Sequence, residues 1–110
     1  FLVHILNVTK DNLLDPFHDR LDKLWNFEQK EISDALHIFC KETCAAVNQE
    51  FEWRMASGDP REKVVEMAEN LKADVLVVGR RGLGVITSTI LGSVSDYCLA
   101  NSTVPVLVVQ

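Results

Sequence analysis

The sequence has no excess of basic residues and no long apolar run. Its 16 acidic side chains outnumber 11 basic ones, which gives a formal net charge of −5. A protein that holds nucleic acid by its phosphates usually presents a basic face, so we expect no nucleic-acid partner. No apolar run reaches the roughly 20 residues that a membrane-spanning helix needs, so we expect no membrane partner either.

Cysteines are few, and the three present are Cys40, Cys44 and Cys98. An odd and sparse set is typical of reduced intracellular thiols, and it predicts a cytoplasmic location. His37, Cys40 and Cys44 share one face of an expected helix, but a zinc site would need a fourth ligand. We therefore predict no metal site. Two cysteines four residues apart on a helix are also poorly aligned for a disulfide.

The order of apolar patterns predicts one α/β domain over residues 1–110. Continuous or alternating apolar runs indicate strands, and amphipathic spacing indicates the helices between them. The expected elements are strand Leu2–Val8, helix Trp25–Asn48, strand Glu50–Ala56, helix Pro60–Leu71, strand Val75–Val78, helix Ser93–Asn101 and strand Val104–Val109. Such alternation predicts an open parallel sheet with helices on both faces. Asp59 is the expected cap of the second helix.

Glycines and serines lie where one expected strand ends and the last helix begins. Gly79 follows the buried strand, and Gly92-Ser93 precede the helix. In an open parallel sheet, ligands bind beyond the carboxyl ends of the strands, and unpaired amides at a helix start attract anions. The segment contains no Gly-Lys-Ser/Thr, and Gly82 and Gly84 lack the third glycine of a dinucleotide motif. Taken alone, the pattern is also compatible with glycines that only form turns and bind no ligand.

The spacing of these residues nevertheless resembles a known motif. Gly79, Gly82 and Gly92-Ser93 follow the pattern G-x2-G-x9-G-S after a buried strand. This pattern is similar to the ATP-binding signature of the universal stress protein family. The motif is long and specific, and it favours a ligand site over simple turns.

Two further segments extend the resemblance over nearly the whole chain. Val3–Val8 resembles the second strand of the family, and Gly58–Pro60 resembles the turn before its third helix. The acidic stretch Thr9–Asp22 is the least typical part. The first strand and helix of the family have no counterpart in this sequence, so we expect further chain upstream of Phe1.

The resemblance implies a nucleotide-binding stress-response domain that acts as a dimer or a regulatory module. It implies ATP as the ligand, or AMP or ADP in its place, and leaves Mg²⁺ open as a companion of ATP. The residues that it assigns to the nucleotide are Ile5, Val78, Gly79, Arg80, Arg81, Gly82, Gly92, Ser93, Val94 and Ser95. Ile5 and Val78 would meet the base, and the others the ribose and phosphates. It also implies a homodimer that pairs through Val104–Val109.

Two other functions stay open from the residues. One is an ATP-using enzyme on a related fold, either a slow ATPase or an adenylyl or phosphoryl transferase. Such an enzyme needs charged groups aimed at the phosphates, and the sequence offers no lysine or paired carboxylates beside the glycines. The other is a structural dimer that has lost nucleotide binding. We assign no catalytic residue, and we expect His4 to be a hydrogen-bonded residue in or near the core.

Overall fold

The computed structural model describes residues 3–9, 19–80 and 91–110, which form seven elements. In chain order these are β1 (Val3–Thr9), α1 (Asp19–Ala46), β2 (Phe51–Ser57), α2 (Pro60–Asn70), β3 (Leu76–Gly79), α3 (Ser93–Asn101) and β4 (Val106–Val109). They divide into two compact units, Phe1–Ser57 and Gly58–Gln110, each of which contains a parallel strand pair. The expectation that residues 1–110 form one domain stays a prediction.

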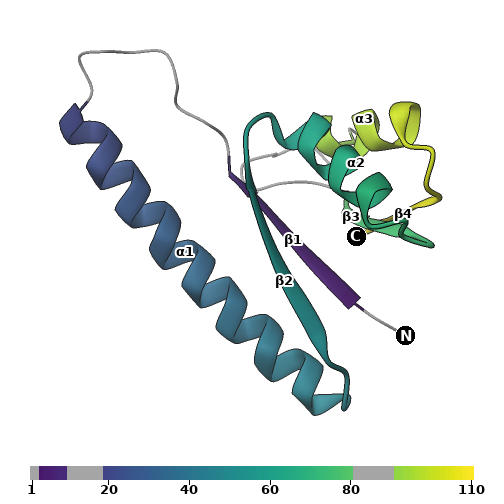
Figure 1. Ribbon diagram of the computed structural model, residues 1–110, viewed down its shortest axis with the longest axis horizontal. Coiled ribbons are helices and arrows are strands. Elements are labelled where there is room, and N and C mark those ends of the chain that lie inside the picture. The colour runs from purple at the N-terminus through teal and green to yellow at the C-terminus, as the bar shows by residue number, and fades with distance from the viewer. Residues whose placement is uncertain (1–2, 10–18, 81–90) are drawn as a thin grey trace. The chain divides into compact units, whose positions relative to one another are not determined.

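The first unit consists of β1, α1 and β2. The two strands pair in parallel, with Val3 opposite Phe51 and Thr9 opposite Ser57. Parallel strands cannot be joined by a tight turn, and here the connection contains the long helix α1, which runs along β2 (Figure 1). Both predicted strands are confirmed to within one residue, whereas the helix begins six residues earlier than its predicted start at Trp25.

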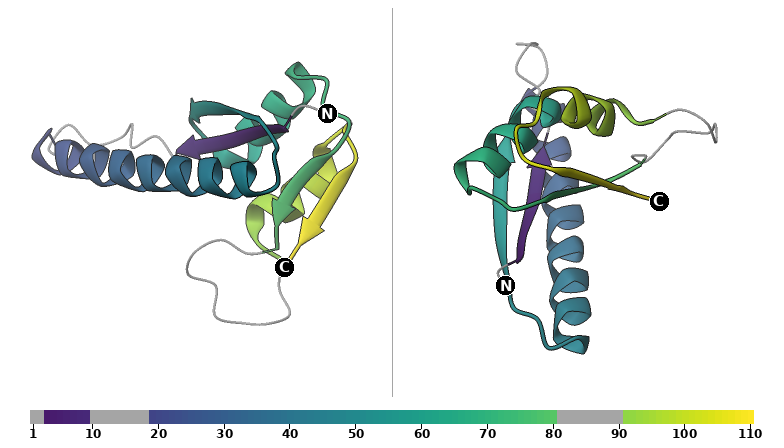
Figure 2. Two further views of the ribbon diagram at one scale, coloured as in Figure 1. Left: turned by 90° about the horizontal axis from the view of Figure 1, so that it is seen from below. Right: turned by 90° about the vertical axis from the view of Figure 1, so that its right-hand side faces the viewer.

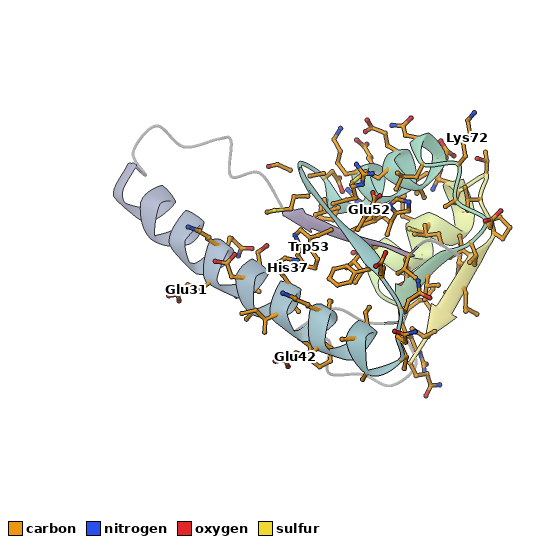
Figure 3. The ribbon with its side chains drawn as sticks, turned by 60° about the horizontal axis from the view of Figure 1, so that its bottom comes forward. Glu31, His37, Glu42, Glu52, Trp53 and Lys72 are labelled. Atoms are coloured by element: carbon orange, nitrogen blue, oxygen red, sulfur yellow. The ribbon has the colours of Figure 1, made fainter. Side chains whose placement is uncertain are left out.

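The helix α1 turns small side chains toward the strand pair. Ser33 is buried and Cys40 is half-buried, while Ile32 and Phe39 are exposed. The ring of His37 contacts Trp53, with ring centroids 5.1 Å apart, and the two side chains point toward one another in Figure 3. The helix therefore forms as the apolar spacing predicts, although two of the large apolar residues in that spacing, Ile32 and Phe39, are exposed.

The second unit consists of α2, β3, α3 and β4. The strands pair in parallel from Leu76 opposite Val106 to Gly79 opposite Val109, and Figure 2 shows them side by side. The helices α2 and α3 pack on each other. The buried apolar residues of the unit come from both helices and β3 and are Val65, Ala68, Leu76 and Cys98. Their burial fixes α3 beside the carboxyl end of β3, where the glycine motif lies.

The sequence predicts the elements of the second unit closely. The helix α3 spans Ser93–Asn101, as predicted, and α2 begins at Pro60 with Asp59 as its cap. The last strand is two residues shorter than its predicted range, because Val104 and Pro105 precede it. Parallel strands alternating with helices confirm the predicted α/β class.

Candidate functional site

The candidate site lies where β3 ends and α3 begins, within the second unit. Beyond Gly79 the strand ladder continues by one bond, in which the amide of Arg80 donates to the carbonyl of Val109 over 2.6 Å. The carbonyl of Arg80 in turn accepts a hydrogen bond from the amide of Gly92 over 2.8 Å. The backbone that leaves β3 is therefore bonded directly to the backbone that enters α3.

A side chain adds a second bond between the same two elements. The hydroxyl of Ser95 donates to the carbonyl of Gly79 over 2.5 Å, although the two residues are 16 positions apart. Ser95 is only 3% exposed, so this bond is shielded from water. Two successive carbonyls at the end of β3 thus accept hydrogen bonds from the first turn of α3.

The first turn of α3 is capped by a residue without a side chain. Gly92 has φ −64° and ψ 151°, and its carbonyl accepts the amide of Asp96 over 2.9 Å. The amides of Ser93, Val94 and Ser95 precede the first bonded amide of the helix, and no side chain of the N-cap covers them. Amides without a partner among residues 3–9, 19–80 and 91–110 and the positive end of the helix dipole together favour an anion at this position.

The backbone of Gly92 does not itself require glycine. Its φ and ψ lie in the extended region that any residue adopts. Among the described glycines a positive φ is found at Gly58, where φ is 137°. The conformation of Gly92 therefore gives no backbone reason for glycine at position 92.

The start of α2, in the same unit, has a side-chain cap instead. There Asp59 is the N-cap, and its carboxylate accepts the amide of Arg61 over 3.0 Å. The guanidinium of Arg61 also bonds this carboxylate, over 2.7 Å and 3.1 Å. The amide of Arg61 at the start of α2 therefore already bonds an anionic group of the protein, and Pro60 before it has no amide.

Six of the ten residues assigned to the nucleotide lie together at this junction. They are Gly79, Arg80, Gly92, Ser93, Val94 and Ser95. Val78 is the half-buried residue before Gly79 on β3. Arg81 and Gly82 lie outside the described residues. Ile5 lies on β1 in the first unit, opposite Trp53.

Sequence reasoning missed the structural bond made by Ser95. The resemblance assigns both Ser93 and Ser95 to the phosphate end of the nucleotide, whereas the structure directs the hydroxyl of Ser95 to a backbone carbonyl. Ser93 is exposed, and its side chain makes no hydrogen bond within the described residues. No sequence signal distinguishes the two serines, because their difference depends on how α3 packs against β3.

His4 differs from its expected role as a hydrogen-bonded residue. It lies opposite Glu52 in the β1–β2 pair, and its Nδ1 is 3.4 Å from Glu52 Oε2. The geometry does not make a hydrogen bond, and among the described residues the buried Nδ1 has no partner. The Glu52 carboxylate forms a salt bridge with Arg54 on the same strand. An exposed pair of this kind contributes little to stability.

The three cysteines are free thiols. Burial raises the pKa of the Cys98 thiol, and burial together with the neighbouring Cys44 raises the pKa of Cys40. A raised thiol pKa lowers the fraction of reactive thiolate at neutral pH. In the described ranges, no three histidine, cysteine or acidic side chains are grouped in a way that could hold a metal ion.

In the described part of the chain, no helix combines the length and the apolar character that crossing a membrane requires. The helix α1 is the longest, with 28 residues, but charged side chains recur throughout its sequence.

The chain belongs to the universal stress protein family, whose family model matches residues 1–110. It is 26% identical over 113 residues to the universal stress protein A-like protein of Arabidopsis thaliana, and the match covers 99% of this chain. The chain spans 65% of the length of that relative.

Solved structures of the family have the same fold. Universal stress protein UspA from Lactobacillus plantarum superposes with a TM-score of 0.83 at 19% identity, covering 99% of this chain and 77% of that protein. A universal stress protein family protein from Arabidopsis thaliana, solved with AMP bound, gives a TM-score of 0.66 at 24% identity. That match covers 99% of this chain and 64% of the other. The fold is therefore the Rossmann-like α/β fold of universal stress proteins.

Proposed function

We propose that this domain binds ATP, or AMP or ADP in its place, at the junction of β3 and α3. The observation that carries the proposal is the open first turn of α3, capped by Gly92 and bonded to the end of β3. A helix start of this kind, beyond the carboxyl end of a parallel strand, is where α/β folds bind phosphates. The AMP bound by the Arabidopsis family member supports an adenine nucleotide as the ligand.

Each end of the nucleotide would meet a different set of residues. The phosphates would accept hydrogen bonds from the amides of Ser93, Val94 and Ser95 and from the exposed hydroxyl of Ser93. Gly79 and the segment Arg80–Gly82 would pass beside the ribose and phosphates. Val78 would contact the base, and the role of Ile5 at the base stays a prediction from the sequence. Mg²⁺ would accompany ATP by binding its phosphate oxygens, since Mg²⁺ prefers oxygen ligands and retains waters.

Isothermal titration of the purified protein with ATP, AMP and adenosine tests the proposal. We expect saturable binding of ATP and a weaker affinity for adenosine, which lacks the phosphates. The variant Gly92→Val should lose most of the ATP affinity, because its side chain would enter the space of the phosphates.

The control for this variant is its own unfolding transition. Valine adopts the extended conformation of residue 92, so the unfolding midpoint should stay close to that of the unchanged protein. A folded Gly92→Val protein with unchanged ATP affinity would exclude the site at this position.

A binding function fits the described residues better than catalysis. Asp96 is the acidic residue in the first turn of α3, and it is exposed. The hydrogen bonds seen between β3 and the first turn of α3 involve backbone groups and the hydroxyl of Ser95. We therefore propose a regulatory stress-response module of the cytoplasm, in which hydrolysis of ATP is slow or absent.

We also propose that two copies pair through Val104–Val109. In a parallel ladder the backbone groups of alternate residues point to one side, and Pro105 and Val109 accept bonds from β3. The backbone groups of Val106 and Val108 therefore face the other edge of β4. In the part of the chain that the structure describes, this edge has no partner strand, and an open strand edge favours pairing with the same edge of a second copy.

Sedimentation velocity at micromolar concentration measures this pairing. We expect a dimer for the unchanged protein and a monomer for Val108→Pro, since proline removes an amide that faces the open edge. A control melt shows whether the variant is folded. A monomeric unchanged protein at this concentration would exclude the dimer.

A further inference from the structure

The two serines in the first turn of α3 have different environments. Ser93 is exposed, whereas Ser95 is 3% exposed and donates its hydroxyl proton to the carbonyl of Gly79. A hydroxyl has a single proton to donate. In this arrangement the side chain of Ser95 therefore has none left for a phosphate.

Two hydrogen bonds join the end of β3 to the first turn of α3, and we call them the β3–α3 clamp. They are the bond from Ser95 Oγ to the Gly79 carbonyl and the bond from the Gly92 amide to the Arg80 carbonyl. Gly92 and Ser95 are three residues apart, so they lie on the same side of the helix. Fixing both positions holds the whole first turn against the strand and limits its tilt.

We propose that Ser95 is a positioning residue for the phosphates, acting through the β3–α3 clamp and not by contacting the ligand. The inference rests on the proposed nucleotide function. In this proposal, binding and orientation are done by different groups. The amides of residues 93–95 and the hydroxyl of Ser93 contact the phosphates. The hydroxyl of Ser95 keeps those amides aimed at one point. Donors held in place before binding lose less freedom when the ligand arrives.

Ser102 offers a matched control at the other end of the same helix. Its hydroxyl donates to the carbonyl of Val104 over 2.9 Å and accepts the amide of Val104 over 3.1 Å. Ser102→Ala therefore removes a serine hydroxyl that bonds the backbone, as Ser95→Ala does. The two variants should have similar unfolding midpoints, and only one of them alters the clamp.

The test combines nucleotide titration with amide hydrogen exchange. We expect Ser95→Ala to weaken ATP binding about tenfold and to leave adenosine binding within about twofold, because the clamp acts on the phosphate donors alone. In the nucleotide-free protein, the amides of Gly92 and Asp96 should exchange faster in Ser95→Ala. Ser102→Ala should change neither the ATP affinity nor the exchange of these two amides.

Three results would overturn the inference, and each has a distinct meaning. Unchanged ATP affinity in Ser95→Ala removes the positioning role and leaves the proposed function intact. Weaker ATP binding with unchanged exchange at Gly92 and Asp96 makes Ser95 a direct phosphate ligand instead. No ATP binding by the unchanged protein overturns the proposed function and this inference with it.

Discussion

The helices α2 and α3 begin in similar backbone conformations but with different caps. Asp59, before α2, has φ −70° and ψ 115°, and Gly92, before α3, has φ −64° and ψ 151°. The Asp59 carboxylate accepts the amide of Arg61 in its helix, whereas Gly92 has no side chain to accept an amide of α3. The two helix starts thus differ in one carboxylate and in one amide donor, because Pro60 at the start of α2 has no amide.

This difference separates a structural helix start from one that can bind a ligand. Aspartate at the N-cap satisfies the amides and stabilises the helix by itself. Glycine gives up that stabilisation and leaves the amides and the positive helix end to an outside anion. Both helices carry an acidic residue in the first turn, Glu62 in α2 and Asp96 in α3, so the two helix starts can be compared within one protein.

Transferring the α2 cap to α3 should have the largest effect. In Gly92→Asp the new carboxylate would bond the amides of α3 and repel phosphate, so we expect ATP affinity to fall roughly 100-fold. Helix stability should rise by a few tenths of a kcal/mol, because aspartate caps better than glycine. Titration calorimetry and urea unfolding measure the two effects. Unchanged ATP affinity in Gly92→Asp would contradict the claim that the cap decides which helix start binds phosphate.

Removing the side-chain cap of α2 should affect the stability of the protein and not its ATP affinity. Asp59→Ala removes the carboxylate that bonds the amide and guanidinium of Arg61, and we expect a loss of about 1 kcal/mol in the free energy of unfolding. ATP affinity should stay within twofold by calorimetry, a limit of about 0.4 kcal/mol. A large loss of ATP binding would mean that the start of α2 takes part in the site.

Removing the exposed hydroxyl of the open helix start should weaken binding moderately. Ser93→Ala takes away one hydrogen bond to the phosphates, which corresponds to about a fivefold loss of ATP affinity. The unfolding transition should not move, since this hydroxyl bonds no described residue. Equal affinities of Ser93→Ala and the unchanged protein, measured by calorimetry, would exclude this hydroxyl as a ligand.

The acidic residues of the two first turns should give the smallest effect. Asp96→Asn removes an exposed negative charge beside the proposed phosphates, and we expect ATP to bind about twofold more tightly at low salt. Glu62→Gln is the matched change in α2 and should leave affinity unchanged. The gain for Asp96→Asn should disappear as salt is added. A gain that persists at high salt would point to a cause other than charge.

The sequence predicts the second unit better than the first. Asp59-Pro60 and Gly92-Ser93 are local signals, so the starts of α2 and α3 follow from a few neighbouring residues. The buried face of α1 could not be predicted, because apolar spacing marks Ile32 and Phe39, while the helix buries Ser33. Periodicity shows that a helix forms and does not show which of two adjacent stripes meets the strand.

The candidate site, too, was predictable from the sequence only in part. The glycine and serine spacing predicts the junction of β3 and α3, where six assigned residues meet. The role of Ser95 depends on a bond across 16 positions, which exists only once the helix packs on the strand. Arg81 and Gly82 lie outside the described residues, and their assignment stays a prediction. The same holds for the contact of Ile5 with the base.

The most direct test of the account is an ATP titration followed by amide NMR. It compares the two helix starts in one protein, without any substitution. We predict that the amides of Ser93, Val94 and Ser95 shift most and saturate together, while those of Arg61 and Glu62 hardly move. Shifts centred on α2, or no saturable shift at residues 93–95, would contradict the central claim that the start of α3, which has no side-chain cap, is the phosphate site.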